Sequence, residues 1–138
     1  MEEEWQRGRQ AMEESLSLLK AGDRAQALNP VDSALVQAIE ENRSTWVITL
    51  CRHAAVVAHV FGDHLREISY EKQALPYCKD YRFAVYNFAR LLLRAGQVDL
   101  AQQYATEAYE LSSSSETEAD RDLTAAILKQ WPNISKSR

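Results

Sequence analysis

The feature that most constrains the fold is a glycine that recurs at a fixed interval between two helical segments. Glycine is scarce, with four residues in 138, and Gly62 and Gly96 lie 34 residues apart. Each ends an apolar segment with helical periodicity and precedes a more polar one, and Gly22 stands in a similar Ala-Gly-Asp context. A period of this length with glycine at the turn is typical of tandem helical hairpins. The sequence therefore predicts an all-α chain of antiparallel helix pairs.

The period extends beyond the turn. When residues 48–81 are aligned on residues 82–115 without a gap, four positions that serve turn or packing roles carry the same residue type. Close helix crossings need small side chains, and a tight turn needs a residue that tolerates positive φ. The four pairs are Ala55 and Ala89, Gly62 and Gly96, Tyr70 and Tyr104, and Ala74 and Ala108.

Hydrophobic periodicity and capping residues predict about seven helices. The first six are expected over about 2–20, from Asn29 and Pro30 onward, and over about 45–61, 64–75, 81–95 and 98–111. A capping box of Ser115 and Glu118 is expected to start the seventh, and Pro132 to stop it. The third and fifth helices are apolar on most of their circumference, so each leaves one narrow polar stripe for solvent or a ligand.

Composition excludes several classes of function. The net charge of −4 and the pI near 5.4 disfavour a general nucleic-acid binder. No apolar stretch is long enough to span a membrane, and the first residues lack the pattern of a secretory signal. Cys51 and Cys78 are expected to be buried thiols in a reducing compartment. We therefore expect a cytoplasmic protein.

In its 34-residue period, its turn glycines and its recurring packing residues, the chain resembles a tetratricopeptide repeat (TPR) protein, most closely over residues 82–115. Residues 48–81 resemble a weaker copy, in which Glu67 stands where the family has a small residue. Residues 8–41 resemble a degenerate first copy, which Pro30 interrupts. The best copy matches the family at these packing positions: Val85, Phe88, Ala89, Leu92, Gly96, Ala101, Tyr104, Ala108 and Leu111.

The resemblance implies a right-handed α-solenoid of antiparallel helix pairs. It implies one domain over residues 1–132, with residues 116–131 as a capping helix and residues 133–138 as a disordered tail. In this family the first helices of successive repeats line a concave groove that holds a peptide or a partner helix. The function implied is a non-catalytic protein–protein interaction module.

The two polar stripes would then face that groove. Because arginine forks suit carboxylates and asparagine can bind a peptide backbone, we expect a protein or peptide partner with an acidic segment or a C-terminal carboxylate. The expected groove residues are Thr49, Arg52, His53, Val56, His59, Phe83, Tyr86, Asn87, Arg90, Arg94 and Arg121.

A sharper hypothesis concerns repeats that grip the C-terminal carboxylate of heat-shock chaperones. Asn87 matches the asparagine of that clamp, and Arg52 and Arg121 are candidate basic partners. Val56 and Thr117, however, stand where the clamp has an amide and a lysine. The alternative is that Asn87 binds water or a backbone carbonyl and that the arginines are solvated.

Neither catalysis nor a cofactor is expected. The chain has no CxxC, HExxH, phosphate-binding glycine loop or nucleophile elbow. His53, His59 and His64 are not spaced to meet on one helix face, and His64 lies beyond the expected turn. We therefore predict no catalytic residue, no metal site and no cofactor.

Two alternatives to a peptide-binding adaptor remain. Short repeat arrays expose apolar end faces, so the chain could instead be a structural module that forms homo-oligomers. It could also be a regulatory domain of a larger signalling assembly. Light scattering distinguishes the oligomer from the adaptor, because self-assembly predicts a mass that grows with concentration.

Overall fold

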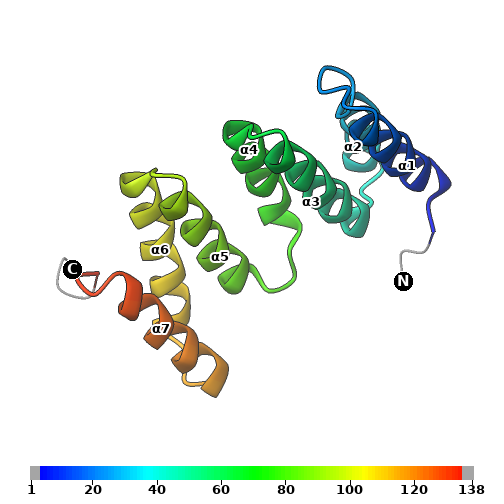
Figure 1. Ribbon diagram of the computed structural model, residues 1–138. Helices are drawn as coiled ribbons and strands as arrows, with labels where there is room; N and C mark the ends of the chain where they lie inside the picture. Colours follow the sequence, from blue (N-terminus) through cyan, green and yellow to red (C-terminus); the bar gives the residue numbers. More distant parts are fainter. Residues whose placement is uncertain (1–3, 135–138) are drawn as a thin grey trace. The chain divides into compact units, whose positions relative to one another are not determined.

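The computed structural model describes residues 4–134, and the described chain is all-α (Figure 1). It contains seven α-helices, one short 3-10 helix and no strand within those residues. The chain divides into two compact units, Met1–Cys78 and Lys79–Arg138, which are described separately. The expectation of one domain over residues 1–132 stays a prediction.

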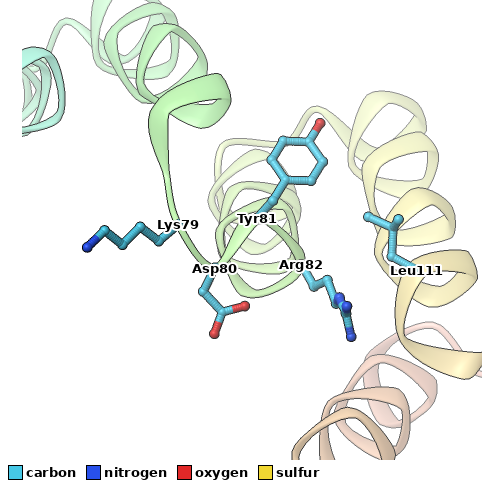
Figure 2. A pocket seen from close by; sticks show the side chains of 5 residues that line it. All are labelled: Lys79, Asp80, Tyr81, Arg82 and Leu111. Carbon is cyan, nitrogen blue, oxygen red and sulfur yellow. The ribbon is translucent and has the colours of Figure 1, made fainter. Parts of the chain in front are cut away.

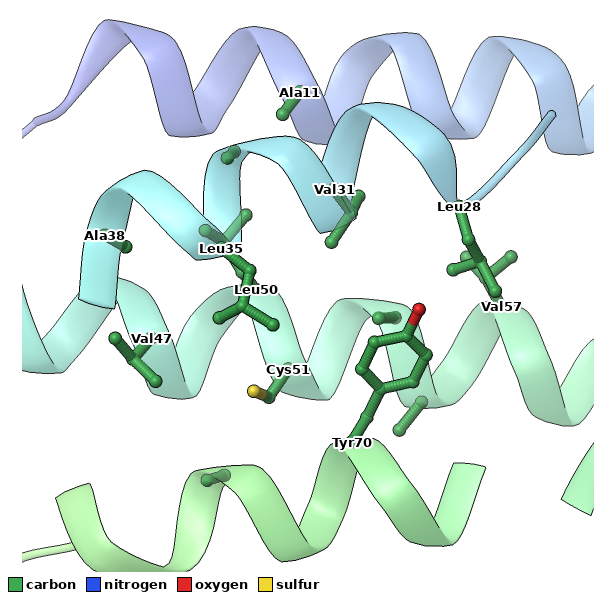
Figure 3. Close-up of a cluster of buried hydrophobic side chains, with 14 of the residues drawn as sticks. Ala11, Leu28, Val31, Leu35, Ala38, Val47, Leu50, Cys51, Val57 and Tyr70 are labelled. Carbon is green, nitrogen blue, oxygen red and sulfur yellow. The ribbon is translucent and has the colours of Figure 1, made fainter. Parts of the chain in front are cut away.

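The first unit contains four α-helices, each packed against the next in sequence. Helix α3 lies at its centre, since it contacts α1, α2 and α4. Figure 3 shows the shared core, in which Leu35 of α2, Leu50 of α3 and Tyr70 of α4 are buried. The elements are α1 (Gln6–Lys20), α2 (Asn29–Glu40), α3 (Ser44–Val60), α4 (His64–Ala74) and the 3-10 helix η1 (Leu75–Tyr77).

The second unit contains α5 (Tyr81–Arg94), α6 (Val98–Ser113) and α7 (Glu118–Gln130). Helix α6 packs against both α5 and α7. Phe88 of α5 meets Tyr104 of α6 edge to face, with ring centroids 4.8 Å apart. Small residues on α6, such as Ala101 and Ala108, are fully buried at the contact. They allow the close helix approach that the repeat alignment predicts.

The glycine turns are confirmed, and a fourth turn of the same kind appears at Asn42. Gly22, Gly62 and Gly96 have φ of 75°, 75° and 82°, and Asn42 has φ of 56°. Each residue donates its N–H to the carbonyl three residues earlier, and the next N–H reaches back five residues. This is the Schellman motif, which satisfies the last carbonyls of a helix. Four helices, α1, α2, α3 and α5, therefore end in the same way.

Helix α1 starts later than predicted. Trp5 is extended, with φ −122° and ψ 105°, and the helix begins at Gln6. The Trp5 ring is buried against Trp46, at a centroid distance of 5.9 Å, with the Arg43 guanidinium 4.8 Å from its centroid. The Trp5 ring is thus packed in the core while its backbone stays extended, and the helix starts only at the next residue. The predicted helical residues Glu2 and Glu3 lie outside the described residues.

The C-terminal end also differs from prediction. Thr117, not Ser115, caps α7, because its hydroxyl accepts a hydrogen bond from the backbone N–H of Asp120. Beyond the helix, Trp131 and Ile134 are buried. The prediction of a disordered tail is therefore wrong at Ile134, whose apolar side chain is covered. Residues 135–138 of the predicted tail lie outside the described residues.

The two thiols differ in burial. Cys51 is fully buried in the core of the first unit, as predicted, and burial raises the pKa of its thiol to about 12. Cys78 is only half-buried, and its Sγ donates to the Ala74 carbonyl at 3.3 Å. Both are free thiols.

Candidate partner-binding surfaces

The predicted polar stripe of α5 forms one continuous surface, which we call the α5 face. Its residues follow the spacing i, i+3, i+4, i+7 and i+11, which places side chains on one side of a helix. Asn87 and Arg94 are exposed and the others are half-buried. The α5 face consists of Phe83, Tyr86, Asn87, Arg90 and Arg94.

The opposite side of α5 explains why this face is free. Val85, Phe88, Ala89 and Leu92 are buried, with exposures of 3% or less. They fix the rotation of α5 about its axis because turning the helix would expose them. The polar side chains are thereby held away from this core by its packing.

Arg90 is the most unusual residue of the α5 face. Its guanidinium lies over the ring of Tyr86, 5.5 Å from the centroid, which is a cation–π contact. Its Nε is buried and has no hydrogen-bond partner among the described residues. A buried donor without an acceptor costs free energy, about 1–3 kcal/mol and more for a charged group. The described residues therefore do not offset the desolvation of the Arg90 Nε, and the Arg90 side chain as a whole is half-buried.

The corresponding stripe of α3, which we call the α3 face, lies in the first unit. The Thr49 hydroxyl donates to the Thr45 carbonyl at 2.8 Å, within its own helix. His53 is half-buried, its Nε2 has no partner in the described structure, and burial lowers its pKa. The α3 face consists of Thr49, Arg52, His53, Val56 and His59.

The α3 face is bordered by acids that the sequence did not reveal. Burial raises the pKa of Glu71 on α4, Arg52 opposes this shift, and Glu67 adds to it. The charge of Arg52 is therefore close enough to interact with the carboxyl group of Glu71. Burial also favours the neutral form of His53, because it lowers the pKa of that ring. The α3 face therefore combines one arginine with neighbouring carboxyl groups, whereas the α5 face carries two arginines.

The three histidines share no helix face, as the sequence indicates, but two of them meet across the turn between α3 and α4. His59 lies in the last turn of α3 and His64 begins α4, and the Gly62 turn brings their ring centroids to 5.9 Å. Both Nδ1 atoms approach the same oxygen, Glu67 Oε1, at 3.1 and 3.3 Å. His53 is not part of this cluster.

Arg121 lies on the first turn of α7 with an exposed side chain. Its neighbour Asp120 is buried and receives the guanidinium of Arg82 from α5. Thr117, which stands where the chaperone clamp has a lysine, uses its hydroxyl to bind the N–H and the carboxylate of Asp120. Thr117 thus has a capping role.

Sequence reasoning missed a hollow of about 490 Å³ at the start of α5 (Figure 2). Tyr81 on its rim donates to Glu107 at 2.7 Å, and this bond raises the tyrosine pKa to about 12. Leu111 was expected to be a packing residue but is 37% exposed here. The hollow is lined by Lys79, Asp80, Tyr81, Arg82 and Leu111.

Comparisons with known proteins bear on the fold. No protein-family model matches the chain, and no curated protein matches it. Among solved structures, it resembles the C-terminal TPR-containing domain of an FK506-binding protein of Plasmodium falciparum. The match covers 95% of this chain and 92% of that one, with a TM-score of 0.51 at 16% identity. It confirms the predicted class, an all-α TPR-like solenoid. Across residues 4–134, no helix has the length and apolar character that crossing a membrane requires.

Proposed function

We propose that this chain is a non-catalytic protein–protein interaction module. On this proposal the α5 face binds a partner segment through a carboxylate, from an acidic side chain or from a C-terminus. Two features of the chain support it: the TPR-like fold, and the arginine-rich face that α5 presents. The cytoplasmic location stays a prediction.

The observation that carries the proposal is the half-buried Arg90, whose guanidinium lies over Tyr86 and whose Nε has no partner among residues 4–134. The Tyr86 ring restricts this guanidinium, so less conformational entropy is lost when a ligand binds. A carboxylate can accept two parallel hydrogen bonds from such a fork. Exposed Asn87, one turn before Arg90, can pair with a peptide backbone group through its amide.

Arg94 extends the same surface by one further turn. Its side chain is exposed, so it supplies charge that attracts an acidic segment but adds little affinity in salt. We therefore assign specificity to Arg90 and a smaller, salt-dependent contribution to Arg94.

Quantitative affinity capture from a cell lysate tests the proposal. The chain is compared with its Arg90→Glu and Arg94→Glu variants, after circular dichroism shows that all are folded. Lys129→Glu on α7 is the matched control, since it makes the same charge change at an exposed site outside the α5 face. A partner retained by the chain and by Lys129→Glu but lost with Arg90→Glu supports the α5 face. Equal capture by all four proteins would contradict it.

A second candidate, self-association, is favoured by exposed apolar side chains on α3. Val56 and Val60 lie one turn apart and are 61% and 59% exposed. Such a pair can pack against the same surface of another copy. Light scattering over a range of concentrations tests this, with Val60→Glu expected to prevent any growth in mass. A regulatory role in a larger signalling assembly stays a prediction.

A further inference from the structure

We propose that His59, His64 and Glu67 form a binding site for a divalent transition metal ion, with zinc as the fitting probe. The three residues each bring one ligand atom, and all three atoms lie within 4.8 Å of one another. The site lies within the first unit, at the turn between α3 and α4, and is independent of the α5 face.

The ligand types suit zinc. Imidazole nitrogen and carboxylate oxygen are common zinc ligands, and two histidines with one glutamate leave a position for water or an external ligand. Each histidine turns its Nδ1 toward the same carboxylate. On metal binding the Nδ1 lone pair of each imidazole would bind the ion while the ring keeps one proton on Nε2, and a ring that starts doubly protonated would release one proton to solvent.

The distances also fit. Two ligands that bind one zinc ion at about 2.0–2.1 Å with tetrahedral angles lie about 3.3 Å apart. The Nδ1 atoms of His59 and His64 are 3.1 and 3.3 Å from Glu67 Oε1. The side chains of the two histidines are 65% and 63% exposed, so their rings have room to rotate and bring the three ligand atoms from within 4.8 Å of one another to that spacing.

The backbone places the three residues in a fixed relation. Gly62, with φ of 75°, reverses the chain between the last turn of α3 and the first turn of α4. His64 and Glu67 are three residues apart on α4, so their side chains lie on one side of the helix. Glu67 is only 15% exposed and is therefore held more firmly than either histidine.

Local charge favours a cation at this turn. Glu67 brings a carboxylate to the turn, and Glu71 follows it one helical turn later on α4. His59 lies in the last turn of α3, where the helix dipole attracts positive charge. A divalent ion bound to Glu67 would offset the carboxylate charge and the negative end of α3, against the opposing positive end of α4 at His64.

The test is a titration of the untagged full chain with zinc chloride, followed by calorimetry and by the imidazole NMR signals. We expect one ion per chain and shifts of the His59 and His64 signals, with the His53 signal as an internal control. His59→Ala and Glu67→Gln should each raise the Kd roughly tenfold or more, since loss of even an outer partner costs about 10- to 100-fold.

Two control variants complete the design. His53→Gln removes a histidine outside the cluster, and Cys78→Ser removes the more accessible thiol; both should leave the Kd unchanged. Circular dichroism checks that each variant is folded. Absence of zinc binding by the wild-type chain, or binding that depends on Cys78 and not on His59 or Glu67, would overturn the proposal.

Discussion

The guanidinium of Arg82, at the start of α5, donates a hydrogen bond to the carboxylate of Asp120, at the start of α7. The two residues are 38 positions apart, and the Asp120 side chain is 7% exposed. The Ser115 hydroxyl, the Arg82 guanidinium and the Thr117 hydroxyl together lower the pKa of Asp120 to about 2. This carboxylate therefore links the first and last helices of the second unit.

The lowered pKa predicts how stability depends on pH. An unfolded aspartate titrates near 3.9, so the ionised group stabilises the fold fully above that pH. The contribution is lost as the pH falls through the folded value of about 2. Asp120→Asn should lower the unfolding midpoint at neutral pH and flatten the loss of stability at acid pH. Asp122→Asn is the control, because Asp122 is an exposed aspartate on the same helix and its replacement should leave stability as in the wild type. Thermal unfolding midpoints measured across a range of pH test this prediction.

Gly8 should not tolerate a side chain. A Cβ on Gly8 would lie 2.6 Å from the Trp46 ring and 2.8 Å from the Trp5 ring. Gly8→Ala is therefore expected to lower the free energy of unfolding by roughly 1–3 kcal/mol through overpacking. Tryptophan fluorescence during urea unfolding measures this. Ser15→Ala on the same helix is the comparison, since it removes a buried hydroxyl without a partner and should be neutral or stabilising. An unaffected Gly8→Ala variant would show that the rings move aside.

Gly96 should be required for its backbone conformation alone. Its φ is 82°, and an added Cβ would meet nothing within 4 Å. Gly96→Ala is expected to cost roughly 1–2 kcal/mol, the penalty of left-handed backbone for a residue with a Cβ. Introducing glycine at the corresponding turn position, Asn42→Gly, should leave the free energy of unfolding nearly unchanged, because asparagine already adopts left-handed backbone there. Urea unfolding that shows equal effects for both variants would refute this account of the turns.

Tyr70 on α4 connects to α2 through Asp32. Its hydroxyl donates to Asp32 Oδ1 at 2.5 Å, and Arg66 donates to Asp32 Oδ2 at 3.0 Å. Burial, then the hydrogen bond to Asp32, raises the tyrosine pKa. Tyr70→Phe should cost roughly 0.5–1.5 kcal/mol of stability. A double-mutant cycle with Asp32→Asn isolates the coupling, and a coupling energy of zero would contradict the assigned bond.

Local signals explain why the fold could be predicted. Helical periodicity and glycine turns act over a few residues, so six of the seven helix starts agree within two residues with those expected. The turn at Asn42 was missed because asparagine marks left-handed backbone less strongly than glycine does. The burial of Ile134 was missed because a lone apolar residue in a polar segment carries no periodic signal.

The polar stripes on single helices could be predicted from the sequence, whereas the side-chain clusters that join different helices could not. The spacing of Tyr86, Asn87 and Arg90 on one helix places them on one side, and the structure agrees. The meeting of His59 with Glu67 depends on a reversal of the chain, and that of Arg82 with Asp120 on the packing of three helices. Neither relation follows from spacing along one helix.

The measurement that tests the central claim most directly is an NMR titration of the isotopically labelled chain with short acidic peptides. Each peptide is supplied with a free C-terminal carboxylate and, as its matched control, with a C-terminal amide and neutral side chains. The account predicts that only carboxylate peptides shift the signals of Asn87, Arg90 and Arg94, and that Arg90→Glu abolishes the shifts. Equal shifts with both peptides, or shifts confined to residues outside α5, would contradict it.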